Sequence, residues 1–167
     1  MVVVFVALLV ALSLMGVGVS YWSDTLTISG TVETGTWGIK IGNPFNCYTY
    51  PDHAKKTEIS CSVDNDGPEV TLEVTVTKAH VAVDYYCDFH IENNGTTPVK
   101  IQSIDLSDLP VGVTGVEREI TGEVAEGVLI DPGQAKDGTV HVYLTDGTSQ
   151  KETFTFTVTF SAVLWNQ

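Results

Sequence analysis

Residues 153–164 read Thr-Phe-Thr-Phe-Thr-Val-Thr-Phe-Ser-Ala-Val-Leu, and this stretch decides the fold class. Hydroxyl and apolar side chains alternate from Thr153 to Ala162, which is the period of a strand with one buried face. No run of ten or more residues in the chain shows the 3.6-residue period of an amphipathic helix. We therefore expect an all-β protein. The apolar face of this last strand holds Phe154, Phe156, Val158, Phe160, Ala162 and Leu164.

Similar alternation recurs upstream and extends the prediction to a whole domain. Between the strands, residues 45–57 look irregular, and Gly and Pro break residues 105–133. At residues 78–80 the apolar side chains change from even-numbered to odd-numbered positions. Either a bulge or a tight turn must shift the register there. Short strands with regular turn signals predict a single β-sandwich or jelly-roll domain over residues 34–167. The apolar faces that carry this prediction are Val70, Leu72, Val74 and Val76; Tyr85, Cys87, Phe89 and Ile91; and Val140, Val142 and Leu144.

The N-terminal segment predicts export. Residues 2–20 carry no charge and are dominated by Val, Leu and Ala. Gly18 and Ser20 would occupy the −3 and −1 positions for cleavage before Tyr21, as in a secretory signal peptide. No Lys or Arg precedes the run, so retention as a membrane anchor is the alternative. We expect residues 1–20 to be a cleaved signal and the protein to be secreted to the cell surface or beyond, meeting a membrane only during export.

Residues 21–33 would then form the free N-terminal strand of the mature protein. Leu26, Ile28 and Val32 share one face with Trp22, and Thr and Ser side chains occupy the other. A free strand with an apolar face needs a sheet to join. The function of the protein therefore depends on whether that sheet belongs to the same chain or to a neighbour.

Charge and motifs exclude several classes of function. The chain has 21 Asp and Glu against 8 Lys and Arg, a net charge of −13, which disfavours nucleic acid and anionic lipid as partners. No nucleotide-binding, hydrolase or metalloprotease motif occurs, so we expect no enzyme and no cofactor. Residues 64–67 resemble the start of a calcium loop but lack its final Glu, and a turn explains them better. Cys87 and His90 would face opposite sides of a strand, so we expect no metal site.

The three cysteines are predicted to be structural. Pairing of Cys47 with Cys61 would close a loop of about fifteen residues and stabilise the fold by roughly 3 kcal/mol. Pairing of Cys61 with Cys87 is the alternative, because both lie on apolar strand faces. With Cys47 and Cys61 paired, Cys87 would remain a buried free thiol. Asn94-Gly95-Thr96 is a glycosylation sequon in a predicted turn.

Several of these segments resemble the TasA/camelysin family, including the archaeal bundling-pilus subunits. Tyr21-Trp22-Ser23-Asp24, directly after the apolar run, is similar to the "Tyr-Phe-Ser-Asp" junction of that family. The hairpin at residues 89–101, the Asp131-Pro132-Gly133-Gln134 turn and the tail at residues 154–167 are also similar. Trp22 in place of Phe, the uncharged start of the signal, and the segment between Cys47 and Cys61 depart from the family pattern.

The resemblance implies a jelly-roll subunit of an extracellular pilus or biofilm-matrix fibre, a homopolymer in which the first strand of one copy completes the sheet of the next. Residues 21–33 would be the donor strand, and lateral bundling of the filaments would follow. Our candidate for the acceptor groove is the last strand, at Phe154, Phe156, Val158 and Phe160. The alternative is a membrane-tethered or cell-envelope β-sandwich binding module whose first strand pairs within its own domain.

Overall fold

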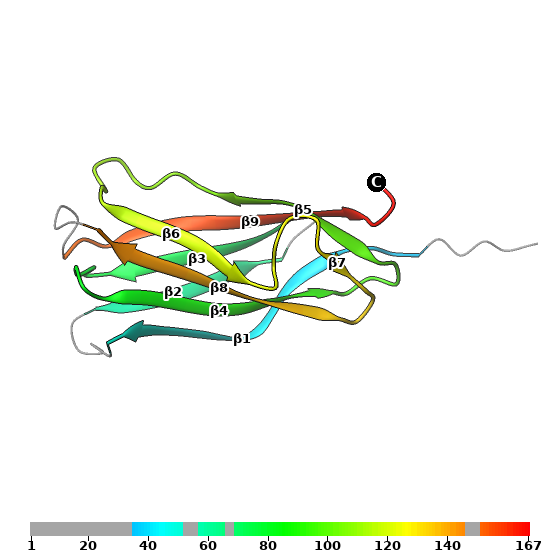
Figure 1. Cartoon of the computed structure of the whole chain (residues 1–167), viewed down its shortest axis with the longest axis horizontal. Helices are drawn as coiled ribbons and strands as arrows, with labels where there is room; N and C mark the ends of the chain where they lie inside the picture. The colour runs from blue at the N-terminus through cyan, green and yellow to red at the C-terminus, as the bar shows by residue number, and fades with distance from the viewer. Residues whose placement is uncertain (1–34, 52–56, 66–68, 146–150) are drawn as a thin grey trace, which may run out of the picture. The chain divides into compact units, whose positions relative to one another are not determined.

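The fold is an all-β sandwich of two antiparallel sheets, as the sequence predicts (Figure 1). The computed structural model describes residues 35–51, 57–65, 69–145 and 151–167. Thr34–Gln167 forms one compact unit, to which every element described below belongs. In this part of the chain no helix is long and apolar enough to cross a membrane. The predicted signal and donor strand lie outside the described residues.

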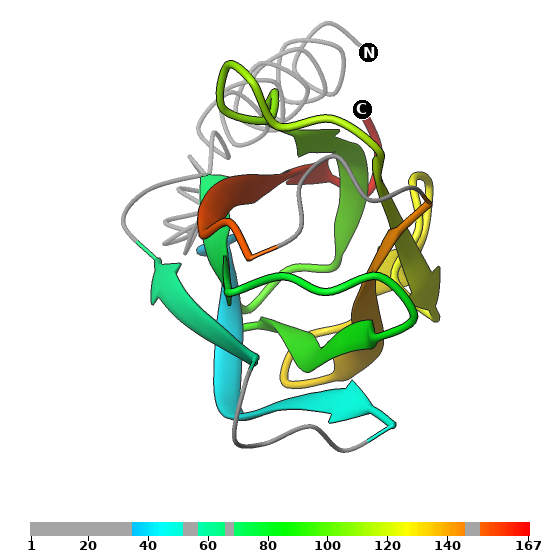
Figure 2. The same ribbon diagram turned by 90° about the vertical axis from the view of Figure 1, so that its left-hand side faces the viewer.

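Sheet A has the strand order β1-β4-β8-β6 and sheet B the order β2-β3-β9-β5-β7. Figure 2 views the two layers from one end. Neighbouring strands are antiparallel throughout. The strands of sheet A are β1 (Ile39–Tyr50), β4 (Asp84–Asn93), β8 (Ala135–Leu144) and β6 (Val116–Gly122). Those of sheet B are β2 (Glu58–Asp64), β3 (Glu69–Thr77), β9 (Phe154–Leu164), β5 (Val99–Leu106) and β7 (Leu129–Ile130).

The core fills the space between the two sheets with the apolar faces read from the alternation. Burial alternates along β3, β4, β8 and β9. Phe89 of sheet A meets Phe160 of sheet B with ring centroids 5.3 Å apart. Full burial of side chains of this size contributes about 1.5–3 kcal/mol each, which makes this core the main source of stability. The opposite face of sheet B carries hydroxyls, and Thr75 and Thr155 are hydrogen-bonded at 2.8 Å.

The structure resolves the parity change near residue 78 as a turn between two strands. β3 ends at Thr77 and β4 begins at Asp84. Lys78 and Ala82 adopt positive φ angles of 53° and 65° in the connection. Because the chain passes from sheet B to sheet A there, the register starts afresh.

Two segments that looked irregular contain strands, which corrects the sequence reading. β1 continues through Tyr50 because a bulge between Gly42 and Asn46 absorbs the interruption near Pro44. Within residues 105–133, where Gly and Pro interrupt the alternation, β6 pairs with β8 over seven residues. Its inward positions alternate apolar with charged residues, so the alternation was too weak to identify the strand.

Asn93 fastens the hairpin between β4 and β5 to β7. It is fully buried, at 0% exposure. Its side-chain amide donates to the carbonyls of Thr97 and Ile130, both at 2.9 Å, and its side-chain oxygen accepts from the Gly95 N–H at 2.9 Å. A single side chain therefore satisfies three backbone groups, one of them fully buried, and fixes β5 in place.

Candidate functional site

The predicted acceptor strand is central in its sheet, which corrects its assignment. β9 pairs with β3 on one edge and with β5 on the other. Phe154, Phe156, Val158 and Phe160 are each at most 2% exposed. A strand that is paired along both edges has no free backbone N–H and C=O groups with which an added strand could form hydrogen bonds. The long alternation of β9 reflects burial at the centre of the sandwich, so a donor strand must dock elsewhere.

The side of the sandwich where β1 meets β2 is closed by side chains. Asn65 follows β2 and donates from its amide to the Ile41 carbonyl at 3.1 Å. Its side-chain oxygen accepts from the Ile41 N–H at 2.8 Å. The amide thereby imitates a neighbouring strand at the outer edge of β1. The sulfurs of Cys47 and Cys61 also meet across this side, 2.7 Å apart.

The opposite side, between β5 and β6, is more open. Among the described strands β6 pairs only with β8. On β5, the two-residue β7 and the residues just before it cover the edge from Val99 to Ile101. Farther along β5, the Ile104 N–H reaches the Glu126 carboxylate at 3.4 Å. Apolar side chains here are only partly buried, and Leu106 is 37% exposed. We call this surface the β5–β6 seam and define it by Ile104, Leu106, Val116, Arg118 and Ile120.

Arg118 is the one long polar side chain among these five residues. Its guanidinium donates to the Ser107 carbonyl at 2.7 Å. The same group lies over the Phe156 ring, 5.0 Å from the centroid. Desolvation by these neighbours lowers the pKa of Arg118. The Arg118 side chain thus covers the core at the seam. It leaves the backbone of β6 as the edge with which a strand entering the seam would form hydrogen bonds.

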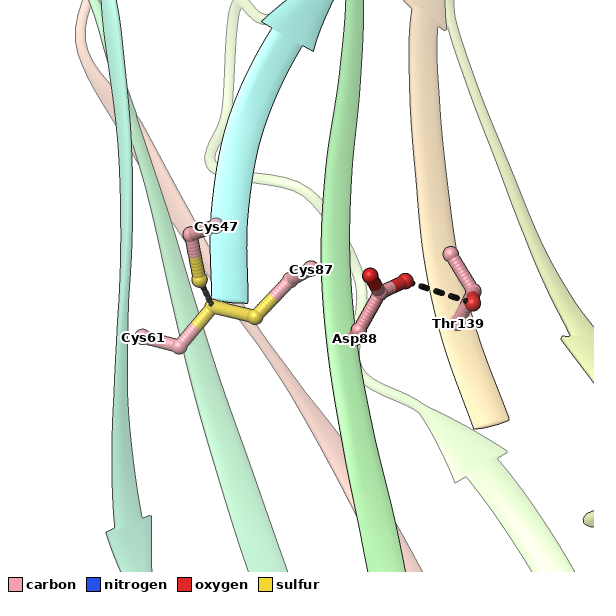
Figure 3. The surroundings of a disulfide bond; sticks show 5 residues. All are labelled: Cys47, Cys61, Cys87, Asp88 and Thr139. Atoms are coloured by element: carbon pink, nitrogen blue, oxygen red, sulfur yellow. Dashed lines mark hydrogen bonds between the residues drawn. A yellow bond between two sulfur atoms is a disulfide. The ribbon is translucent and has the colours of Figure 1, made fainter. Parts of the chain in front are cut away.

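The three cysteines lie together between the sheets (Figure 3). Cys47 of β1 stands directly opposite Cys87 of β4 in sheet A, and Cys61 of β2 faces both from sheet B. Burial, followed by the negative charge of Asp88, raises the pKa of the Cys47 thiol to about 11. Asp88 itself points away from the cluster and accepts a hydrogen bond from Thr139 at 2.7 Å.

The disulfide joins Cys61 to Cys87, the pairing that the sequence left as the alternative. Cys47 is the free thiol, so the preferred Cys47–Cys61 prediction is corrected. That prediction treated the residues between Cys47 and Cys61 as one irregular loop. Because β1 and β2 instead belong to different sheets, Cys61 lies within reach of two cysteines of sheet A. The inward parity of Cys61 and Cys87 was the signal for this arrangement.

A row of aromatic rings crosses the outer face of sheet A. Tyr48, Tyr86 and His141 stack in sequence with centroids 5.2 and 4.5 Å apart. His141 also contacts Glu119 at 2.8 Å and Asp84 at 3.2 Å. The rings turn their faces toward one another across β1, β4 and β8. We interpret the row as cross-strand stabilisation.

Of the remaining residues that the sequence singled out, Asn94 and His90 lie in the described part of the chain and the four donor-strand residues do not. Asn94 is exposed in the turn between β4 and β5, and its glycosylation stays a prediction. His90 is half-buried and faces away from Cys87, as the strand parity indicates. Trp22, Leu26, Ile28 and Val32 lie outside the described residues.

No protein-family model matches the chain, and neither a curated protein nor a solved structure does.

Proposed function

We propose that this protein is the structural subunit of an extracellular filament, joined head to tail by donor-strand complementation. Residues 21–33 of one copy dock in the β5–β6 seam of the next. The observation that carries the proposal is the seam itself, where an incompletely paired strand edge adjoins partly exposed apolar side chains. Contacts of this heterologous kind do not close into rings, so they generate filaments.

The donor and the seam match in length. The apolar face of the donor runs from Leu26 to Val32, seven residues, and β6 also has seven. Ladder hydrogen bonds along β6 would supply affinity, and alternate side chains would supply specificity. Burial of Leu26, Ile28 and Val32 contributes roughly 1.5–3 kcal/mol each before ordering costs.

The two faces also match in shape. Inward positions of β6 are Val116, Arg118 and Ile120, with the large Arg118 side chain in the middle. On the donor, Gly30 lies on the apolar face between Ile28 and Val32. Docking Gly30 opposite Arg118 leaves room for the guanidinium and places Ile28 and Val32 beside the aliphatic residues of β6.

Lateral bundling follows from the surface of sheet B. Thr side chains of β3 and β9 cover its outer face, where polar contacts between filaments can form. With a net charge of −13, subunits repel one another at low salt, and cations screen that repulsion. We therefore expect bundles at high salt and separate filaments at low salt.

The test compares chains that begin at Tyr21 and at Thr34 by electron microscopy and sedimentation. We expect filaments only from the longer chain. Within it, Ile28→Asp should prevent assembly, and Thr27→Asp, on the opposite donor face, should permit it. Filaments from the chain that begins at Thr34, or equal assembly by both Asp variants, would refute the proposal.

A further inference from the structure

Three cysteine sulfurs converge from three strands and both sheets, which is more than a disulfide requires. The sulfurs of Cys47, Cys61 and Cys87 all lie within 4.8 Å of one another. Figure 3 shows the three side chains pointing toward a common centre. A disulfide uses two of them, and the third lies 2.7 Å from the Cys61 sulfur. With the disulfide reduced, the same backbone presents three soft ligands to one point.

Reduction of the Cys61–Cys87 bond frees all three sulfurs, which can then move apart around a metal ion. A thiolate bound to a first-row d¹⁰ ion has a metal–sulfur distance of about 2.3 Å, which places three sulfurs around one ion about 4 Å apart. The described residues add no His, Asp or Glu to the group, so the ion must accept three protein ligands. Thiolate ligands select Cu(I) among the common soft ions, and Cu(I) is stable in three-coordinate trigonal geometry. We propose that Cys47, Cys61 and Cys87 in their reduced form bind one Cu(I) ion.

The step from disulfide to metal site balances with a dithiol as reductant. The dithiol supplies two electrons and two protons to the Cys61–Cys87 bond and itself becomes a cyclic disulfide. Cu(I) then displaces the protons of the thiols it binds. Cys47 and Cys61 are only half-buried, so the ion and solvent can reach the site.

The experiment uses the full chain, reduced with dithiothreitol and desalted without oxygen. Cu(I) is added in the presence of bicinchoninate, a coloured Cu(I) chelator that reports the metal it retains. The variants are Cys47→Ser, which leaves the Cys61–Cys87 pair in place, and His90→Gln as the matched control. His90 is three residues from Cys87 but lies on the other face of β4. Circular dichroism of each reduced protein verifies that the sheets persist.

We expect one Cu(I) per chain and the luminescence of a copper–thiolate site sheltered from water. Cys47→Ser should weaken binding at least tenfold, and His90→Gln should leave it unchanged. Complete transfer of copper to the chelator by the folded reduced protein would overturn the proposal, and so would wild-type affinity in Cys47→Ser. If Zn(II) added in equal amount displaced the copper, the assignment to Cu(I) would be wrong.

Discussion

Replacing Ile120 by Asp should weaken filament assembly far more than it weakens the fold. Ile120 lies on the inward face of β6 and is only partly buried in the single subunit, so the seam becomes dry only when a donor strand covers it. The substitution removes an apolar contact with the donor and places a carboxylate in the closed seam. Thr121→Asp, at the neighbouring exposed position on the opposite face of β6, is the matched control.

The docking free energy that Ile120→Asp removes has a lower and an upper bound. Loss of the Ile120 contact costs about 1.5 kcal/mol of docking free energy, the low end of the range for burying a side chain of this size. If the carboxylate must be neutralised at pH 7 from an ordinary pKa near 3.9, docking loses a further ~4 kcal/mol. Since about 1.4 kcal/mol corresponds to tenfold in an equilibrium constant, the subunit concentration needed for assembly should rise between roughly tenfold and several thousandfold.

The assay is the concentration of subunit that remains in the supernatant after filaments sediment. Thermal unfolding of each variant shows whether the domain itself is intact. We expect Ile120→Asp to raise the supernatant concentration at least tenfold relative to Thr121→Asp. Equal concentrations for the two variants would show that β6 does not receive the donor strand.

Three further predictions concern the donor register, the hairpin and the free thiol. Gly30→Val should raise the assembly concentration at least tenfold in the sedimentation assay, with Ser29→Val as control, because the new side chain would meet Arg118. Asn93→Ala leaves three buried or partly buried backbone groups without their side-chain partner and should lower the unfolding free energy by about 3 kcal/mol, whereas the exposed Asn94→Ala should not, as denaturant titration can show. Cys47 holds its proton more tightly in the folded state, so its contribution to stability is complete below pH 9 and is lost as the pH rises toward 11. The difference in unfolding free energy between wild type and Cys47→Ser should therefore shift against the wild type over that pH range.

Alternation along the chain predicted which residues would be buried. The strict period of β9 and the apolar runs of β3 and β4 depend only on neighbours in sequence, and these faces form the core as expected. The same local pattern says nothing about whether a strand is central or at an edge. β9 pairs with β3, some 80 residues earlier in the chain, and with β5, some 60 residues earlier, and neither partner can be read from its own sequence. For this reason the sequence could not show that both edges of β9, the candidate acceptor strand, are already paired.

The seam and the cysteine cluster show the same limit. β6 carries Arg118 at the centre of its inward face, and this charge concealed the strand from any search for alternation. Cys47 lies beyond a bulge in β1, so its parity could not be continued from the residues before Pro44. The alternation could place Cys61 and Cys87 on inward faces. It could not predict that β1 pairs with β4, which is what brings Cys47 to the other two sulfurs.

The most direct test of donor-strand docking mixes the domain of residues 34–167 with a synthetic peptide of residues 21–33. Isothermal titration calorimetry should show one peptide bound per domain, and Ile120→Asp in the domain should weaken that binding at least tenfold. A peptide with the same composition in scrambled order should not bind. A domain that is folded and monomeric yet binds no peptide would contradict the account.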